Sequence, residues 1–274
     1  MSSPTERAFA DRYGPWALVL GGSEGIGASF AQRIAREGVN LVLVARRSEP
    51  LDATANGIRD ATGVTLRTVV LDLTADDVLD RLVAATDDLD IGLLVYNAGA
   101  THGAARFHDE PAEAPLRLVR LNCVGPLLTC HHFGGRMAAR GRGGIILLTS
   151  MSALCGAART VTYSATKAFD LVFAEGLWAE LRPRGVDVLA LVAGATRTPA
   201  MRRSGARVGS EEFPGMDSDE VARDGLANLA HGPTWVVGDG NRAGFEFLRS
   251  RPRAEAVATM SQAVRALYAL PDDS

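Results

Sequence analysis

Short apolar runs of strand length alternate along the chain with longer stretches in which apolar residues recur at helical spacing. Six runs have the length and composition of buried strands: residues 16–20, 39–44, 64–71, 91–96, 145–149 and 186–192. Runs that are apolar on both faces are expected where helices cover both sides of a parallel sheet. The pattern therefore predicts an α/β fold built on a doubly wound parallel sheet.

The pattern changes after the sixth run. Residues 196–219 are rich in Gly, Arg, Ser and Glu and show no apolar period, which predicts a mobile loop. Because this loop follows the carboxyl end of a strand, a substrate lid is the first interpretation, and a disordered surface loop is the alternative.

Residues 235–237 could add a seventh strand. In a C-terminal extension, residues 239–274, a final helix has one apolar face, expected to contact the core or another subunit: Val257, Met260, Val264, Leu267 and Tyr268.

Composition excludes several classes of function. The 274 residues carry a net charge of −3, and no Lys/Arg run reaches five, so nucleic acid is not an expected partner. The longest apolar runs are about half of what a membrane-spanning helix needs, and residues 1–13 lack the apolar centre of a signal peptide. Cys123, Cys130 and Cys155 are too few for a disulfide framework, and the histidines form no metal-binding pattern. We expect one domain, residues 1–274, in the cytoplasm without a metal.

A glycine turn follows the first predicted strand and leads into a helical period. Gly21 permits a tight turn, Gly25 lets the backbone approach a pyrophosphate, and Gly27 allows close helix packing, with Ser23 and Ile26 between them. Tight strand–helix turns favour glycine in any case, so the cluster alone is weak evidence. Its place after the first strand of an alternating chain favours a dinucleotide site.

The end of the second strand carries Arg46 and Arg47 where a carboxylate would bind the ribose hydroxyls of NAD. Adjacent guanidinium groups suit a 2′-phosphate, which favours NADP(H) over NAD(H). The alternative is a pair of solvated arginines at a strand end. Glu24 would repel the phosphate if it faced it, so we expect Glu24 to point away.

Three residues form a candidate proton-transfer set. Tyr163 and Lys167 are four apart on a predicted helix, which puts both on one face, and Ser150 ends the fifth strand. A phenol is a weak acid near neutrality, but a nearby ammonium favours the phenolate. Ser150 can then donate a hydrogen bond to a substrate carbonyl while Tyr163 delivers the proton and the carbonyl carbon receives hydride.

These features, in this order, resemble the short-chain dehydrogenase/reductase family over nearly the whole chain. The resemblance implies a single-domain Rossmann-type fold in which Tyr163 is the general acid/base, Ser150 orients the carbonyl, Lys167 also holds the nicotinamide ribose and Asn122 holds a water that relays protons. Further matches imply cofactor contacts at Asp72 with its neighbour Leu73, at Asn97, Ala98 and Gly99, and at Gly194 and Thr198. Taken alone, Asp72 could be a helix cap, Asn122 a satisfied polar group and Thr198 a cap before Pro199.

The chain also departs from the family pattern. Leu20 stands in place of a threonine, Tyr96 in place of an asparagine and Ala193 in place of a proline. Within the family, residues 13–27 with Arg46 and Arg47 look like those of bacterial NADP-dependent 7β-hydroxysteroid dehydrogenases.

We therefore expect an enzyme that interconverts a ketone and a secondary alcohol with NADP(H), on a bulky lipophilic substrate such as a hydroxysteroid that Met201, Phe213 and Met216 help enclose. The alternatives are a reductase of 3-oxoacyl or aromatic ketones, or a non-catalytic NADP-binding protein. The resemblance also implies a homodimer or homotetramer.

Overall fold

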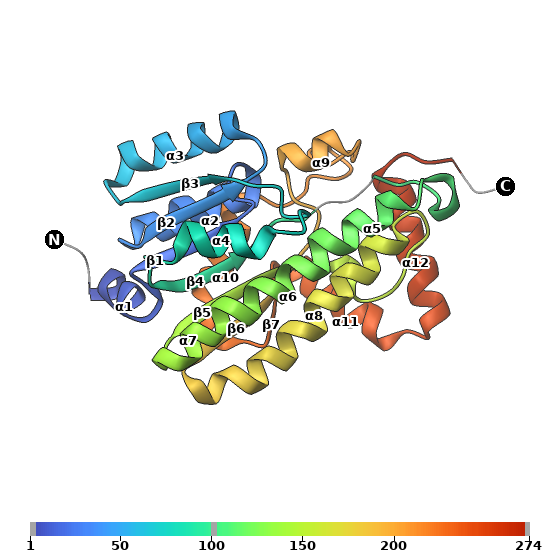
Figure 1. Ribbon diagram of the computed structural model, residues 1–274. Helices are drawn as coiled ribbons and strands as arrows, with labels where there is room; N and C mark the ends of the chain where they lie inside the picture. Colours follow the sequence, from blue (N-terminus) through green and yellow to red (C-terminus); the bar gives the residue numbers. More distant parts are fainter. Residues whose placement is uncertain (1–3, 100–102, 272–274) are drawn as a thin grey trace.

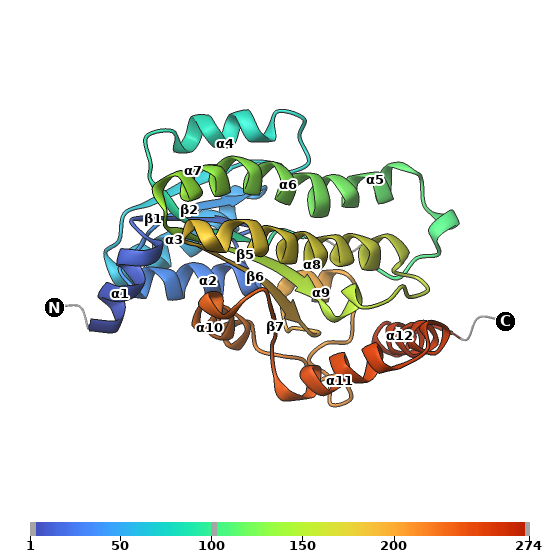
Figure 2. The ribbon, with the colours of Figure 1, turned by 90° about the horizontal axis from the view of Figure 1, so that it is seen from below.

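The computed structural model describes residues 4–99 and 103–271, which form one parallel sheet with helices on both faces (Figures 1 and 2). The strand order is β3-β2-β1-β4-β5-β6-β7. The strands are β1 (Trp16–Leu20), β2 (Asn40–Ala45), β3 (Leu66–Val70), β4 (Ile91–Tyr96), β5 (Gly143–Ser150), β6 (Val186–Ala193) and β7 (Thr234–Val236). The six predicted strands and the optional seventh are confirmed, with bounds that shift by up to two residues.

The helices between the strands follow the predicted alternation. Their bounds are α1 (Pro4–Tyr13), α2 (Gly25–Arg36), α3 (Ser48–Thr62), α4 (Val78–Thr86), α5 (Glu113–Val119), α6 (Gly125–Thr129), α7 (Gly135–Arg140), α8 (Val161–Leu181), α9 (Pro199–Arg203), α10 (Ser218–Ala227), α11 (Asp239–Ser250) and α12 (Arg253–Leu267). Two π-helical turns, Arg120–Val124 and Cys130–Gly134, join α5, α6 and α7 into one rod that runs beside α8 (Figures 1 and 2).

Side chains at alternate positions of the strands lie in two apolar layers, one on each face of the sheet. In β1, Ala17 and Val19 pack toward α2, α3 and α10, whereas Leu18 and Leu20 pack toward α4, α7 and α8. The side chains of the central strands β1, β2, β4, β5 and β6 are nearly all buried in these layers, because helices cover both faces of the sheet. The carboxyl edge of the sheet is therefore where a ligand is expected to bind.

The strand order reverses direction between β1 and β4, which are neighbours in the sheet although β2 and β3 intervene in sequence. A reversal of this kind opens a crevice outside the carboxyl ends of the two strands. The glycine turn after β1 and residues Asn97–Gly99 after β4 both lie at this edge, because the backbone N–H groups of Asn97 and Ala98 donate to the carbonyl of Leu20.

Residues 196–219 are more regular than the predicted loop. Thr198 caps the short helix α9, Thr196 forms an isolated parallel bridge with Met216, and α10 begins at Ser218. The prediction of an irregular segment was wrong at these points because Thr198 and Pro199 supply a cap and a first turn that apolar periodicity does not record.

The C-terminal extension folds into α11 and α12, which pack against the segment after β5. Phe245 and Leu248 contact Met151 and Leu154, and Ala256 contacts Cys155. Of the apolar face expected to contact the core or another subunit, Val264 is buried and Val257 is exposed, and Ala256 is also buried in α12. Residues 272–274 of the predicted extension lie outside the described residues. None of the described helices is long and apolar enough to cross a membrane.

Candidate active site

A cleft of about 590 Å³ opens at the carboxyl edge of the sheet. Most of the predicted site residues line it: Gly21, Ser23, Gly25, Ile26, Arg46, Arg47, Leu73, Asn97, Ala98, Gly99, Tyr163, Lys167 and Thr198. Further lining residues were not expected from the sequence, and examples are Leu121, Leu148, Thr149, Arg203 and Ser204. Gly27, Asp72, Asn122, Ser150 and Gly194 are not among the described lining residues.

The glycine turn has the shape that a dinucleotide phosphate needs. Gly21 has φ +85°, and a Cβ there would lie 2.8 Å from the backbone nitrogen of Ala98. Gly25 has φ +56°, and its Cβ would lie 2.9 Å from Cγ2 of Thr198. Side chains at either position would be strained and would fill the space beside the helix N-terminus. Asn97 holds the turn, since its Nδ2 donates to the carbonyl of Gly21 at 3.0 Å. The residues present therefore fit a nicotinamide dinucleotide.

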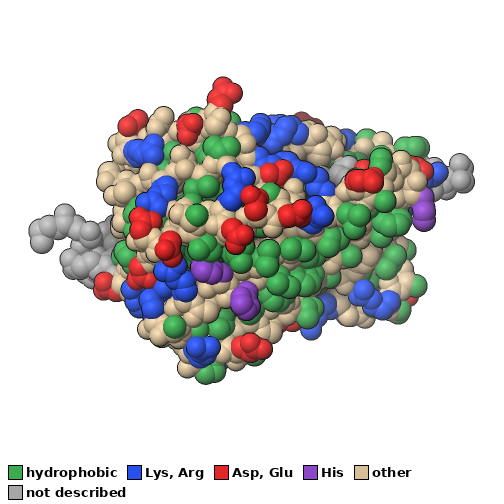
Figure 3. Space-filling view, viewed as in Figure 1, with side chains coloured by type: hydrophobic (Ala, Val, Ile, Leu, Met, Phe, Trp, Pro, Cys, Tyr) green, Lys and Arg blue, Asp and Glu red, His purple; other side chains and the backbone are tan. Residues whose placement is uncertain are grey.

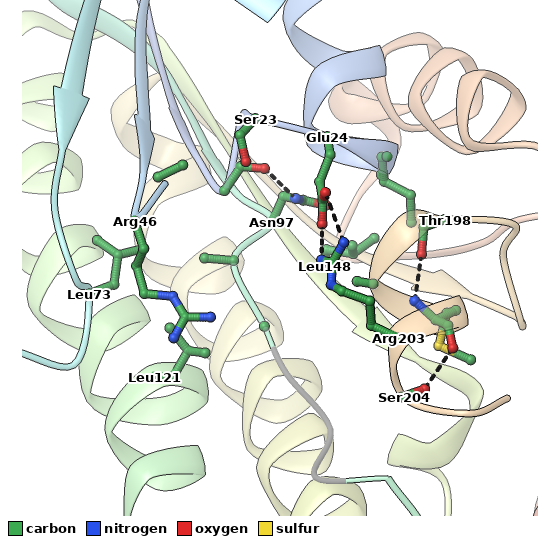
Figure 4. Close-up of a pocket in the computed structure, with 18 of the residues that line it drawn as sticks. Ser23, Glu24, Arg46, Leu73, Asn97, Leu121, Leu148, Thr198, Arg203 and Ser204 are labelled. Carbon is green, nitrogen blue, oxygen red and sulfur yellow. Dashed lines mark hydrogen bonds and ion pairs between the residues drawn. The ribbon is translucent and has the colours of Figure 1, made fainter. Parts of the chain in front are cut away.

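Glu24 does not point away from the cleft, so that expectation was wrong. Its carboxylate accepts a hydrogen bond from Arg47 Nη2 at 2.7 Å and a bidentate pair from Arg203, the last residue of α9. Figure 4 shows Glu24 directed toward Arg203, while Arg46 lies on the side of Leu73 and Leu121. Burial alone would raise the pKa of Glu24, but the hydrogen bonds and charges of Arg203 and Arg47 outweigh it and lower the pKa. The carboxylate is thus an anion bound between two cations.

Three other predicted cofactor contacts have local partners. Asp72 accepts hydrogen bonds from the backbone N–H and hydroxyl of Thr74 and from Arg117. Gly194 is close to α11, because a Cβ there would lie 2.5 Å from Oδ1 of Asn241. Thr198 both lines the cleft and caps α9 by accepting from the N–H of Met201 at 3.2 Å. The cap and the cleft contact are therefore compatible at Thr198.

Tyr163 and Lys167 both face the cleft from α8, as their spacing predicts. Nζ of Lys167 donates to the carbonyl of Leu148 at 2.8 Å and to Oδ2 of Asp170 at 2.9 Å. A Cβ on Gly99 would lie 3.3 Å from the same Nζ, so the ammonium reaches the floor of the cleft. Lys167 is the only lysine in the sequence; every other basic residue besides histidine is arginine. This composition is a second sequence signal for Lys167, because a compact ammonium and a planar guanidinium are not interchangeable.

Asn122 lies near Lys167 in a π-helical turn, and Ser150 ends the strand β5. Asn122 is fully buried in the first π-helical turn, where its Nδ2 donates to Oγ1 of Thr166 at 3.0 Å. Its Oδ1 would lie 3.6 Å from a Cβ on Gly99, so it approaches the same corner of the cleft as Lys167. Ser150 ends β5, and its Oγ accepts from the N–H of Ser152 at 3.1 Å, which leaves its own hydrogen available to a substrate oxygen.

The residues expected to enclose a substrate divide into two groups. Met201 lines the cleft, whereas Met216 packs on the core. Phe213 lies under the guanidinium of Arg207, with Cζ of Arg207 5.6 Å from the centroid of the Phe213 ring. The terminal helix reaches this segment, because Arg207 N donates to the carbonyl of Leu267 at 3.0 Å. The extension therefore contacts the segment 196–219, part of which lines the cleft.

The fold and the cleft together define an α/β protein of the dinucleotide-binding class. The family model described as short chain dehydrogenase matches residues 15–208. The chain belongs to the short-chain dehydrogenase family and is an oxidoreductase of that family, which binds NAD(P).

The relatives include several hydroxysteroid enzymes. A 7β-hydroxysteroid dehydrogenase of Clostridium sardiniense is 30% identical over 254 residues, which cover 93% of this chain and 97% of the relative. A solved structure of a 7β-hydroxysteroid dehydrogenase superposes with a TM-score of 0.86 at 28% identity, over 92% of this chain and 98% of that one. A short-chain dehydrogenase from Sphingobium yanoikuyae in complex with NADPH has a TM-score of 0.73 at 33% identity, over 88% and 97% of the two chains.

Proposed function

We propose that the protein is an NADP(H)-dependent oxidoreductase that interconverts a ketone and a secondary alcohol. The observation that carries the proposal is that Tyr163 and Lys167 face one cleft from α8, opposite the glycine turn at Gly21 and Gly25. A phenol, an ammonium and a dinucleotide cradle in one cleft are the set that proton and hydride transfer to a carbonyl requires.

The bound nicotinamide supplies the hydride or accepts it. The chain's own residues handle the oxygen and the proton. In ketone reduction, Ser150 donates a hydrogen bond to the carbonyl oxygen and Tyr163 delivers the proton that forms the alcohol. Lys167 stabilises the negative charge that develops on Tyr163, and the Asn122 side chain lies at the corner from which a proton relay to Lys167 would start. Alcohol oxidation uses the same groups in reverse.

The preference for NADP(H) rests on Arg46 and Arg47, which line the cleft at the end of β2. Two guanidinium groups can bind a 2′-phosphate bidentately, whereas no carboxylate follows β2 directly to accept ribose hydroxyls. The NADPH-bound relative from Sphingobium yanoikuyae supports the same choice. Asp72 and Gly194 are proposed to contribute to the cofactor site, together with the described residues of the cleft wall.

The proposed substrate is a bulky lipophilic ketone such as a ketosteroid. The likeness to 7β-hydroxysteroid dehydrogenases over nearly the whole chain supports this class. Residues 196–219 are proposed to act as the substrate lid, because Met201, Arg203 and Ser204 of this segment line the cleft.

A homodimer or homotetramer is proposed from an exposed apolar face. Figure 3 shows hydrophobic side chains gathered over the rod of α5–α7 and over α8. Its exposed members include Leu116, Val119, Val124, Leu127, Val161 and Val172. A patch of this kind is typical of a protein–protein contact.

The three cysteines are free thiols, which suits the proposed cytoplasmic location.

The proposed function is tested by following NADPH oxidation with a panel of steroid, 3-oxoacyl and aromatic ketones. We expect turnover with steroid ketones. Tyr163→Phe should lower kcat by about 1000-fold or more, with NADPH binding measured by fluorescence left nearly unchanged. Undiminished turnover by Tyr163→Phe would refute the assignment. NADPH binding without turnover of any ketone would instead favour a non-catalytic binding protein.

A further inference from the structure

Asp170 is a buried carboxylate on the helix that carries the proposed catalytic pair. Tyr163, Lys167 and Asp170 stand at positions i, i+4 and i+7 of α8, so they share one face of the helix. Asp170 is 2% exposed, and it does not line the cleft among the described residues. A charged side chain in such a place is costly unless a partner compensates it.

Lys167 is that partner. Oδ2 of Asp170 lies 2.9 Å from Nζ of Lys167, which is itself only 6% exposed. The ammonium has three hydrogens, and two of them are used by Asp170 and by the carbonyl of Leu148. One acceptor is on α8 and the other on β5, so together they fix the direction of the third hydrogen. Gly99, at the floor of the cleft, is the neighbour on the remaining side.

The other titratable groups facing Asp170 carry no charge near neutral pH. Tyr96 comes from β4, Cys123 from the first π-helical turn and Cys130 from the second. Burial raises the pKa of Tyr96 and Cys130 far above their usual range and raises that of Cys123 to about 11, and the charge of Asp170 adds to each effect. Oδ1 of Asp170 is buried with no hydrogen-bond partner among the described residues. Burial raises the pKa of Asp170, and the charge and hydrogen bond of Lys167 act against that effect, so Lys167 supplies the charge that balances this carboxylate.

We propose that Asp170 is a positioning residue, whose carboxylate holds the buried Lys167 in its ammonium form in the cleft that Tyr163 also lines. The role in turnover rests on the proposed function, whereas the effect on Lys167 does not. Burial in an apolar site favours a neutral lysine, and a carboxylate in direct contact favours the charged one. The balance here favours the charge: burial lowers the pKa of Lys167, but Asp170 and Tyr163 outweigh it and raise the pKa.

The carboxylate also affects the pH at which Lys167 loses its proton. A negative charge in direct contact favours the ammonium form, so removal of that charge should let Lys167 release its proton at lower pH. Ketone reduction is proposed to need the ammonium, so the alkaline limb of its pH–rate profile should move toward acid pH.

Because Lys167 is the only lysine, its protonation can be measured directly. Protein labelled with ¹³C-lysine gives one Cε resonance, and the measurement needs neither cofactor nor substrate. In the wild type we expect this resonance to keep its ammonium position to a higher pH than the Cε resonance of an unperturbed lysine, because the pKa of Lys167 is raised by Asp170. Asparagine has nearly the same shape as aspartate, and in Asp170→Asn the midpoint of the Lys167 titration should fall by about one pH unit or more. Asp170→Glu should restore most of the shift.

The matched control is Asp187→Asn. Asp187 is also buried and ion-paired, but it lies in the second position of β6, and its partners are Tyr13 and Arg12. The control should leave the Lys167 titration and the alkaline limb unchanged, and thermal unfolding of all variants reports any loss of stability. A midpoint in Asp170→Asn equal to that of the wild type would overturn the proposal. A wild-type midpoint below the usual lysine range would do so without any variant.

Turnover separates this inference from the function on which it rests. Suppose that Tyr163→Phe abolishes ketone reduction, and that Asp170→Asn lowers kcat at least about 10-fold and moves the alkaline limb of the pH–rate profile toward acid pH. The proposed function and the positioning role of Asp170 are then both supported. If Tyr163→Phe abolishes reduction but Asp170→Asn leaves the limb in place, the positioning role fails alone. If Tyr163→Phe retains activity, the proposed function fails, whatever the lysine resonance shows.

Discussion

Glu24 and Arg203 connect the two sides of the cleft, because the carboxylate at the start of α2 accepts a bidentate pair of hydrogen bonds from the last residue of α9. The same carboxylate accepts from Arg47 at 2.7 Å. One anion therefore links α9 to a guanidinium that is proposed to bind the 2′-phosphate. We expect cofactor selectivity and the position of the proposed lid to be coupled through Glu24.

Glu24→Gln should strengthen NADPH binding. The amide carries no charge, so it holds Arg47 less tightly and the guanidinium is more readily available to the phosphate. A partly exposed ion pair is worth on the order of 1 kcal/mol, which is several-fold in affinity. NADH binding should stay the same, since NADH has no 2′-phosphate. Fluorescence titration with both cofactors measures the effect. Glu180→Gln, an exposed residue near the far end of α8, is the control for loss of one negative charge. Weaker NADPH binding by Glu24→Gln would contradict the coupling.

Arg46 and Arg47 should carry the discrimination between cofactors. Replacement of both by alanine removes the charge-assisted hydrogen bonds to the phosphate, and we expect KM for NADPH to rise by about 10-fold or more while KM for NADH changes little. Steady-state kinetics with each cofactor give the comparison. Arg265→Ala, in the last turn of α12, removes a cation elsewhere and should have no effect. Equal losses with NADPH and NADH would show that the arginines support the fold of the cleft rather than select the phosphate.

Local patterns predicted the parts of the site that depend on local geometry. The strand runs, the glycine turn and the spacing of Tyr163 and Lys167 each involve residues close in sequence, and the structure brings them to one edge of the sheet. The direction of Glu24 was not predictable in this way. Its partner Arg203 is 179 residues away, so only the folded chain brings the two together.

The buried charge at Asp170 was missed for a related reason. An acid three residues after a lysine on a helix is most often a solvated ion pair, and the sequence alone does not record that both side chains are buried. The single lysine among many arginines was the available signal. The two π-helical turns of the α5–α7 rod leave no mark in apolar spacing either.

Tyr96 stands where the family has an asparagine, and its position suggests a structural reason. Its hydroxyl donates to the carbonyl of Leu121 at 2.6 Å, in the π-helical turn that carries Asn122. Tyr96→Phe should therefore cost about 1 to 3 kcal/mol of unfolding free energy, because it leaves that carbonyl without its partner. Urea denaturation gives the value. Tyr268→Phe removes a hydroxyl whose contact with Ser204 is 3.4 Å, and it should cost far less. Equal costs in the two variants would show that the Tyr96 bond does not support the turn.

Asp72 should make stability depend on pH in the acid range. Burial alone would raise its pKa, but Thr74 and Arg117 outweigh it and lower the pKa from 3.8 to about 2. A carboxyl group whose pKa is lower in the folded state stabilises the fold above its unfolded pKa, and the contribution is lost as the pH falls through the folded value. The side chain is 39% exposed, so solvent screening limits the effect, and Asp72→Asn should cost about 1 kcal/mol near neutral pH. Urea denaturation should show that the difference in unfolding free energy between wild type and Asp72→Asn narrows from about pH 4 toward pH 2.

Asp76→Asn is the control: the Asp76 side chain is 92% exposed, and the difference in unfolding free energy from the wild type should show no such narrowing. A difference between wild type and Asp72→Asn that stays constant down to pH 2 would mean that the ionised carboxylate does not stabilise the fold, and the hydrogen bonds from Thr74 would then act without its charge.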